Sequence, residues 1–167
     1  MISAASNDPS VATLDRLKVT AARANRISID SYQSLQDFAR SLPAPAVEGQ
    51  QEAQADVERA WFFAAISREV AGLTVRISDE LMFLCSMTIG SGIIRGDLRQ
   101  KLAKALDSYR PLPGQPVDLR QQRLRRLPID EALNHIMNNL DLMCSQVDAL
   151  IGALSAPEQE IAQTSTV

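Results

Sequence analysis

The stretch LNHIMNNLDLMCSQVDALIGAL, from Leu133 to Leu154, has the most regular apolar pattern in this sequence. Apolar residues recur there every seven positions, with further apolar residues between them: Leu133, Leu140, Val147 and Leu154, and Ile136, Met143 and Leu150. Three such heptads on one side of a helix are typical of a helical bundle or a coiled coil. The pattern predicts a long C-terminal helix over residues 129–154.

Apolar residues at steps of three and four also follow Pro9, which stands where a helix would begin with Asn7 or Asp8 as its N-cap. Two polar residues, Ser28 and Ser31, interrupt the apolar side of this helix, and they indicate a kink or a break. Pro43 would end the helix, because a proline disfavours the helical conformation of the residue before it.

A second apolar face is expected further along the chain, formed by Val57, Trp61, Ala64, Ala65, Phe63, Ile66, Val70, Leu73 and Ile77. The triplet Ser78-Asp79-Glu80 has the character of an N-cap and an acidic first turn, and predicts that a new helix begins there and runs to Ile89. In IGSGIIRG (89–96), the glycines favour a helix end and a tight turn. Asp97, followed by Gln100, resembles a capping box that opens another short helix.

These patterns predict an all-α fold, an up-and-down bundle of four to five helices that includes the long C-terminal one. We expect a bundle core over residues 1–110, a Pro-rich and basic linker over 111–128, the long helix of the same domain over 129–154, and a disordered tail over 155–167. A chain of 167 residues is long enough for one domain with its own hydrophobic core.

The composition indicates a cytoplasmic protein. No basic and apolar leader is visible at the N-terminus, and the most apolar run, Leu81 to Ile94, is shorter than the roughly 20 residues of a membrane-spanning helix. The two cysteines, Cys85 and Cys144, lie within apolar stretches, as reduced and buried thiols do. The excess of arginine over lysine, 14 against 3, is associated with GC-rich bacterial genomes.

Charge is distributed in blocks. Residues 95–126 hold nine basic and three acidic residues, whereas residues 127–167 hold six acidic residues and no basic one. The basic segment could fold back against the acidic last helix, or it could bind an acidic protein partner. Nucleic acid and an anionic membrane surface are less favoured partners. Nucleic acid is disfavoured because the total charge is −3 and Tyr109 is the one aromatic residue near the basic residues.

His135 is the single histidine of the chain, and Asn138 and Asn139 follow it. Some sensor kinases carry a His-x-x-x-Asn-Asn-Leu helix, but here the first asparagine comes one residue earlier, which turns it by about 100° around the helix. A phosphoryl-accepting role for His135 is therefore an alternative, and a hydrogen-bonded surface histidine is the simpler interpretation.

No motif requires an enzyme. One histidine and two separated cysteines do not form a zinc site, and Glu131 and His135 have the wrong spacing for a carboxylate-bridged metal site. Gly90 and Gly92 begin a pattern similar to the dinucleotide fingerprint, but Gly96 comes one position late and no β-α-β unit surrounds it. We expect no catalytic residue, no metal and no cofactor.

A few short motifs are similar to those of the alphaproteobacterial FlaF-type flagellin-synthesis regulators, namely Trp61, LCSMTIG (84–90), Ile129-Asp130 and Ile136-Met137. The chain departs from that pattern, because it needs an insertion around the Pro-rich linker and lacks the Leu-Pro and Arg that stand between the first two motifs. The resemblance does not identify a family, and we transfer no residue roles from it.

We therefore expect a non-catalytic interaction protein, such as an adaptor, an export chaperone or an assembly regulator. The long helix would either complete the bundle or pair with a partner helix, and a homodimer through it is possible. The expected partner-binding residues are Leu133, Ile136, Leu140, Met143, Val147 and Leu150 on this helix, and Arg120, Arg123, Arg125 and Arg126 before it. The alternatives are a phosphorelay bundle protein with His135 as acceptor, and nucleic-acid binding through residues 120–126.

Overall fold

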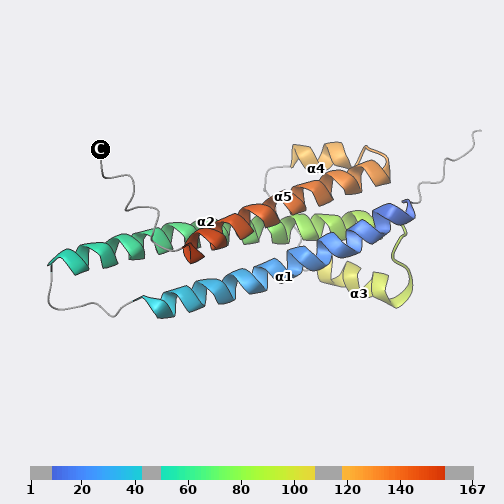
Figure 1. Cartoon of the computed structure of the whole chain (residues 1–167). Helices are drawn as coiled ribbons and strands as arrows, with labels where there is room; N and C mark the ends of the chain where they lie inside the picture. Colours follow the sequence, from blue (N-terminus) through green and yellow to red (C-terminus); the bar gives the residue numbers. More distant parts are fainter. Residues whose placement is uncertain (1–8, 43–49, 108–117, 157–167) are drawn as a thin grey trace, which may run out of the picture. The chain divides into compact units, whose positions relative to one another are not determined.

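A computed structural model describes residues 9–42, 50–107 and 118–156 of the chain, and in these residues it contains five α-helices and no strand (Figure 1). The helices are α1 (Val11–Ser41), α2 (Gln50–Gly90), α3 (Gly96–Asp107), α4 (Leu119–Leu124) and α5 (Ile129–Ser155). The fold is an all-α bundle with a long C-terminal helix, as the heptad pattern predicts. No helix of the described part is apolar over a length sufficient to cross a membrane.

The helices form two compact units, and α1, α2 and α5 contribute residues to both. Unit 1 comprises residues 1–24 and 76–143, and unit 2 comprises residues 25–75 and 144–167. The expected linker contains helix α4 at residues 119–124, whereas its residues 111–117 and the expected tail from residue 157 lie outside the described residues.

In unit 1, consecutive segments of α1, α2 and α5 run in alternating directions (Figure 1). The apolar side of α5 lies at the centre of this unit, because its side chains there are fully shielded from solvent. The buried residues of unit 1 include Ile77, Phe83, Leu84, Leu124, Leu133, Ile136, Met137 and Leu140. Burying side chains of this size is the main driving force for folding in such a bundle.

Unit 2 has its own apolar core, formed from α1, α2 and α5 by Ile27, Ile66, Val70, Leu73, Cys144, Val147 and Leu154. The rings of Phe38 and Phe63 stack with their centroids 5.5 Å apart, which joins α1 to α2. Neither the buried Cys144 nor the half-buried Cys85 is in a disulfide, and burial raises the pKa of the Cys85 thiol.

Helix α1 continues through the serines that were expected to kink or break it. Ser31 is buried, and its hydroxyl donates to the carbonyl oxygen of Ser28 at 3.2 Å. A serine that binds a carbonyl of the preceding turn satisfies its own hydroxyl, so it can occupy a helix interior without ending it. The helix begins later than predicted, at Val11, and the amide of Thr13 donates to the hydroxyl of Ser10, which is the N-cap.

Helix α2 also continues through Ser78-Asp79-Glu80, so the prediction of a new helix at this triplet is wrong. Glu80 is buried within unit 1 instead of capping a helix end. The glycines after α2 behave as expected, because Gly92 and Gly96 adopt positive φ angles of 75° and 67° in the turn that leads to α3.

The expected second apolar face of α2 is in fact two faces. Phe63, Ile66 and Val70 point into the core of unit 2, whereas Val57 and Trp61 are exposed to solvent. Residues 61 and 63 differ by about 200° around an α-helix, so the two sets lie on opposite sides.

Candidate functional site

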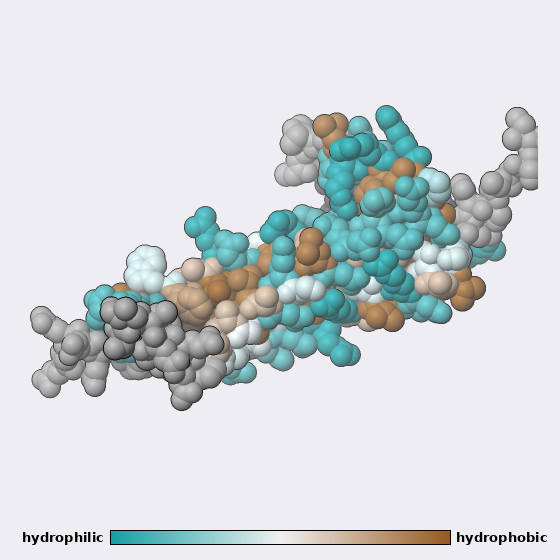
Figure 2. All heavy atoms as spheres, turned by 45° about the horizontal axis from the view of Figure 1, so that its top comes forward, coloured by the Kyte–Doolittle hydropathy of each residue, from teal (hydrophilic) through white to brown (hydrophobic). Residues whose placement is uncertain are grey.

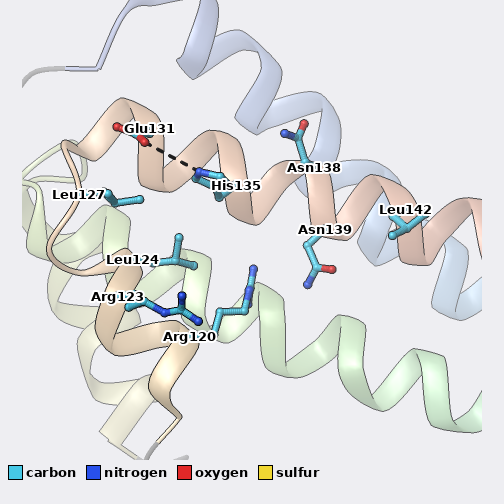
Figure 3. Close-up of a pocket in the computed structure, with 9 residues that line it drawn as sticks. All are labelled: Arg120, Arg123, Leu124, Leu127, Glu131, His135, Asn138, Asn139 and Leu142. Carbon is cyan, nitrogen blue, oxygen red and sulfur yellow. Dashed lines mark ion pairs between the residues drawn. The ribbon is translucent and has the colours of Figure 1, made fainter.

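An open groove of about 550 Å³ lies between α4 and the first half of α5, entirely within unit 1 (Figure 3). It combines two guanidinium groups, an imidazole, a carboxylate, two carboxamides and three leucines. The lining residues are Arg120, Arg123, Leu124 and Leu127 on one side, and Glu131, His135, Asn138, Asn139 and Leu142 on α5. Such a mixture of cationic, amide and apolar groups is suited to binding a ligand or a partner segment.

The wall formed by α4 begins with a well-defined helix cap. The side chain of Asp118 accepts hydrogen bonds from the backbone amides of Arg120, at 2.9 Å, and Gln121, at 3.1 Å. These bonds satisfy amides that a helix N-terminus leaves without partners. Leu124 at the other end of α4 is buried, which holds this short helix against the rest of unit 1.

Arg120 attaches α4 to α2 through Glu80. Its two terminal nitrogens lie 2.9 and 2.6 Å from the two carboxylate oxygens of Glu80, whose side chain is only 8% exposed. The hydrogen bond to Glu80 raises the pKa of Arg120, so this guanidinium stays positively charged beside the groove. A two-bond contact of this kind fixes orientation as well as distance.

Arg125 provides a second attachment to α2. Its guanidinium lies over the ring of Phe83, 5.3 Å from the centroid, and donates to the hydroxyl of Ser86 at 3.1 Å. The basic segment therefore does fold back, but Arg120 and Arg125 bind α2 and not the acidic last helix. Arg123 and Arg126 are exposed, and of these Arg123 lines the groove.

The wall formed by α5 carries His135, whose side chain is 56% exposed. Its Nε2 atom lies 4.0 Å from a carboxylate oxygen of Glu131, one turn earlier on the same helix, and the contact becomes an ion pair when the imidazole is protonated. Figure 3 shows the two side chains next to each other along the first turns of α5, joined by this contact.

The asparagines around His135 hold α1 against α5. Arg16 of α1 donates to the amide oxygens of Asn134, at 3.2 Å, and Asn138, and it forms an ion pair with Asp141 at 3.2 Å. Positions 134, 138 and 141 lie on one side of a helix, so a single guanidinium can reach all three. Their spacing opposite an arginine was the available signal for this contact, and sequence reasoning missed it.

The apolar residues of α5 that were expected to bind a partner are shielded from solvent within this chain. Leu133, Ile136, Leu140, Met143 and Val147 are buried, and Leu150 is half-buried. Of the two alternatives for the long helix, the described packing is that of a helix that completes the bundle. By contrast, Leu142 lies off the heptad positions and is 57% exposed at the groove.

In the described residues, no three His, Cys, Asp or Glu side chains gather as the ligands of a metal ion would. No protein-family model, no curated protein and no solved structure matches this chain. The function is therefore argued from the geometry of the groove.

Proposed function

We propose that this chain is a non-catalytic interaction protein, an adaptor, export chaperone or assembly regulator, whose α4–α5 groove binds an acidic helical segment of a protein partner. The observation that carries the proposal is that one groove is lined both by the exposed Arg123 and by the exposed Leu142. An amphipathic helix with carboxylates on one edge and a leucine or similar residue on its face would match this surface.

Each part of the groove has a separate role in this proposal. The guanidinium of Arg123 is exposed and can pair with a carboxylate, while Arg120, whose charge is paired with Glu80, forms part of the groove wall. Leu127 and Leu142 supply apolar contacts, and the amide of Asn139 supplies a donor and an acceptor. The excess of basic residues over 95–126 would increase the rate of association with an acidic partner.

The test uses the full chain, labelled with ¹⁵N, and a synthetic amphipathic helical peptide built from glutamate, leucine and alanine. We expect the backbone resonances of Arg123, His135 and Leu142 to shift together on titration. Arg123→Glu should weaken binding about tenfold, which corresponds to about 1.4 kcal/mol. Arg126→Glu is the matched control, since Arg126 is an exposed arginine of the same segment that does not line the groove. Equal losses of affinity in both variants would contradict specific binding in the groove and would indicate nonspecific charge attraction.

The phosphorelay alternative has one observation in its favour. His135 lines the same groove as Arg123, whose exposed guanidinium could neutralise a phosphoryl group on the imidazole. Incubation with acetyl phosphate, followed by detection of phosphohistidine, tests this alternative. A signal that His135→Gln abolishes would favour it, and an unmodified wild-type chain would end it.

A cytoplasmic location and a bacterial source also belong to the proposal. They rest on the two cysteines, neither of which is in a disulfide, and on the excess of arginine over lysine, respectively. The nucleic-acid alternative would require Arg123 and Arg126 to act largely without Arg120 and Arg125, which bind α2.

A further inference from the structure

Helix α2 carries a second heptad pattern on the side that faces away from the core of unit 2. Its positions follow one another at steps of four and three residues: Val57, Trp61, Ala64, Arg68, Ala71 and Val75. We call this set the outer stripe. The core-facing residues Phe63, Ile66, Val70 and Leu73 form the inner pattern of the same helix. Two heptad patterns on one helix are expected where the helix packs against neighbours on both sides.

The outer stripe is open to solvent. Trp61 is 73% exposed, Val57 and Val75 are each exposed by half or more, and the alanines and Arg68 are exposed as well. Isolated hydrophobic residues are common on protein surfaces, as the brown side chains scattered among teal ones in Figure 2 illustrate. An aligned stripe is different, because it extends about 27 Å along one helix and offers a continuous contact surface.

The residues beside the outer stripe are small. Ala60, Ala65 and Gly72 flank it and are exposed. Gly72 lies in the middle of α2, where glycine lowers helix stability, yet its φ is not positive and nothing lies within 4 Å of the position where a Cβ would be. The fold of this chain therefore gives no reason for a glycine at this position. A second backbone passing close to the helix would give one.

We propose that the outer stripe binds the outer stripe of a second copy of this chain, with the two α2 helices antiparallel about a two-fold axis beside residue 66. This arrangement places Trp61 against Ala71 of the second copy, and Val57 against Val75. It also places Arg68 against Ala64 of the second copy, one layer from Trp61, where a guanidinium can lie against the indole ring. Each large side chain thus meets a small one, and the same residues serve both copies, as a two-fold interface requires.

Charge and size exclude the parallel arrangement. Two parallel helices in register would place Arg68 against Arg68 and Trp61 against Trp61, while Ala64 and Ala71 would face alanines. The two Arg68 side chains would then repel each other. The two Trp61 rings would be too large for their layer, and the facing alanines would leave their layers underpacked. For a pair of copies, the order of residues along the stripe therefore favours the antiparallel direction.

The size of the stripe sets the expected strength. A helix contact of about 27 Å by roughly 10 Å covers a few hundred Å² per copy, less than the roughly 800 Å² of a standard interface. We therefore expect a weak and reversible dimer.

Trp61 is the single tryptophan of the chain, so its fluorescence reports on the stripe alone. The full chain would be measured by light scattering and by tryptophan emission over a concentration range of roughly 5 to 500 µM. We expect the molar mass to rise from 18.3 kDa towards twice that value, with a shift of the emission to shorter wavelength. A chain that stays monomeric over this range overturns the proposal. A short-wavelength emission at monomer mass also overturns it, because another segment of the same chain would then cover Trp61.

Ala71→Glu places a charge where Trp61 of the second copy would lie, and it leaves the reporter in place. It should abolish both the rise in molar mass and the shift of the tryptophan emission. The helix content measured by circular dichroism should not change, because Ala71 is exposed. Ala55→Glu is the matched control, an exposed alanine of the same helix about 160° around from Ala71. Dimerisation that persists in Ala71→Glu would place the interface elsewhere and overturn the proposal.

Cysteine crosslinking tests the direction of the two helices. Ala65 lies next to the two-fold axis, so Ala65→Cys should form a disulfide between two copies under mild oxidation, above the background of Cys85 in the unmodified chain. Ala71→Cys should not, since two antiparallel copies hold this position about 15 Å apart along the axis. A disulfide between two copies of Ala71→Cys, with none between two copies of Ala65→Cys, would show a parallel pair and overturn the proposal.

Discussion

Two arginines of unit 1 join helices to one another in very different surroundings. Arg120 of α4 binds Glu80 of α2 through two hydrogen bonds, and Glu80 is almost completely shielded from water. Arg16 of α1 binds Asn134, Asn138 and Asp141 of α5, where the side chains of Arg16 and Asp141 are each 37% exposed. One contact is a nearly isolated pair, and the other is a shared surface network.

The difference lies in what remains when the arginine is removed. Water can approach the carboxylate of Asp141, and Arg23 also lies 3.7 Å from it. Glu80 has no comparable access to solvent, so its charge depends on Arg120. Removing one partner of such a buried contact therefore lowers the free energy of unfolding strongly. The intact pair nevertheless stabilises the fold no more than a well-packed apolar pair would.

The largest effect should come from Arg120→Ala. We expect it to lower the free energy of unfolding by about 2–3 kcal/mol, less than for a fully buried pair because Arg120 is itself 40% exposed. Urea denaturation at neutral pH measures this change. The control is the double variant Arg120→Met with Glu80→Met, which leaves no buried charge and should cost less than about 1 kcal/mol. A double variant as unstable as the single one would show that packing, and not the charge of Glu80, sets the cost.

A smaller effect is expected for Arg16→Ala, about 1 kcal/mol, because Asn134 and Asn138 can bind water and Asp141 keeps Arg23 nearby. Repeating the denaturation in roughly 1 M NaCl should reduce this cost, since salt screens exposed charges more than buried ones. The cost of Arg120→Ala should persist in the same salt. An equal response of the two variants to salt would remove the distinction between the two contacts.

The smallest effect is expected for Asp130→Ala, about 0.5–1 kcal/mol. The two carboxylate oxygens of Asp130 accept hydrogen bonds from the amide of Ser10, at 3.1 and 3.2 Å, so this contact holds α1 to α5 without any cation. Amide hydrogen exchange at Ser10 should accelerate along with the loss of stability. Glu131→Ala is the control, because Glu131 shares the first turn of α5 but contacts His135, whereas Asp130 accepts from Ser10. Identical results would assign the effect of Asp130 to the helix dipole alone.

The parts of the fold that local spacing decides were predictable. The heptads of Leu133 to Leu154 identify α5, and the glycines at 92 and 96 identify the turn before α3. Glu80 was misinterpreted because Ser-Asp-Glu is a true signal for a helix start, and the partner that makes it a buried residue lies 40 positions away. Trp61 was assigned to the face of Phe63 because apolar residues occur all round α2, and a single sequence does not indicate which side of such a helix is covered.

The groove was not predictable for the same reason. His135 and Arg123 were recognised as candidates, but only the docking of α4 on α2 through Arg120 and Arg125 brings α4 opposite α5. Leu142 could have been noticed, since it is an apolar residue outside the heptad positions of an otherwise regular helix.

The contacts between α1 and α5 also determine when this chain can fold during its synthesis. The hydrogen bond of the Ser10 amide needs Asp130, which is synthesised 120 residues later. The contact of Arg16 with Asp141 needs a residue synthesised 125 positions later. Segments of α5 complete the cores of both units. The apolar sides of α1 and α2 therefore stay uncovered on the ribosome until α5 has been translated and has left the exit tunnel. Neither unit can form early and protect the other, so this protein should depend on chaperones that shield nascent helices more than its short, simple topology would suggest.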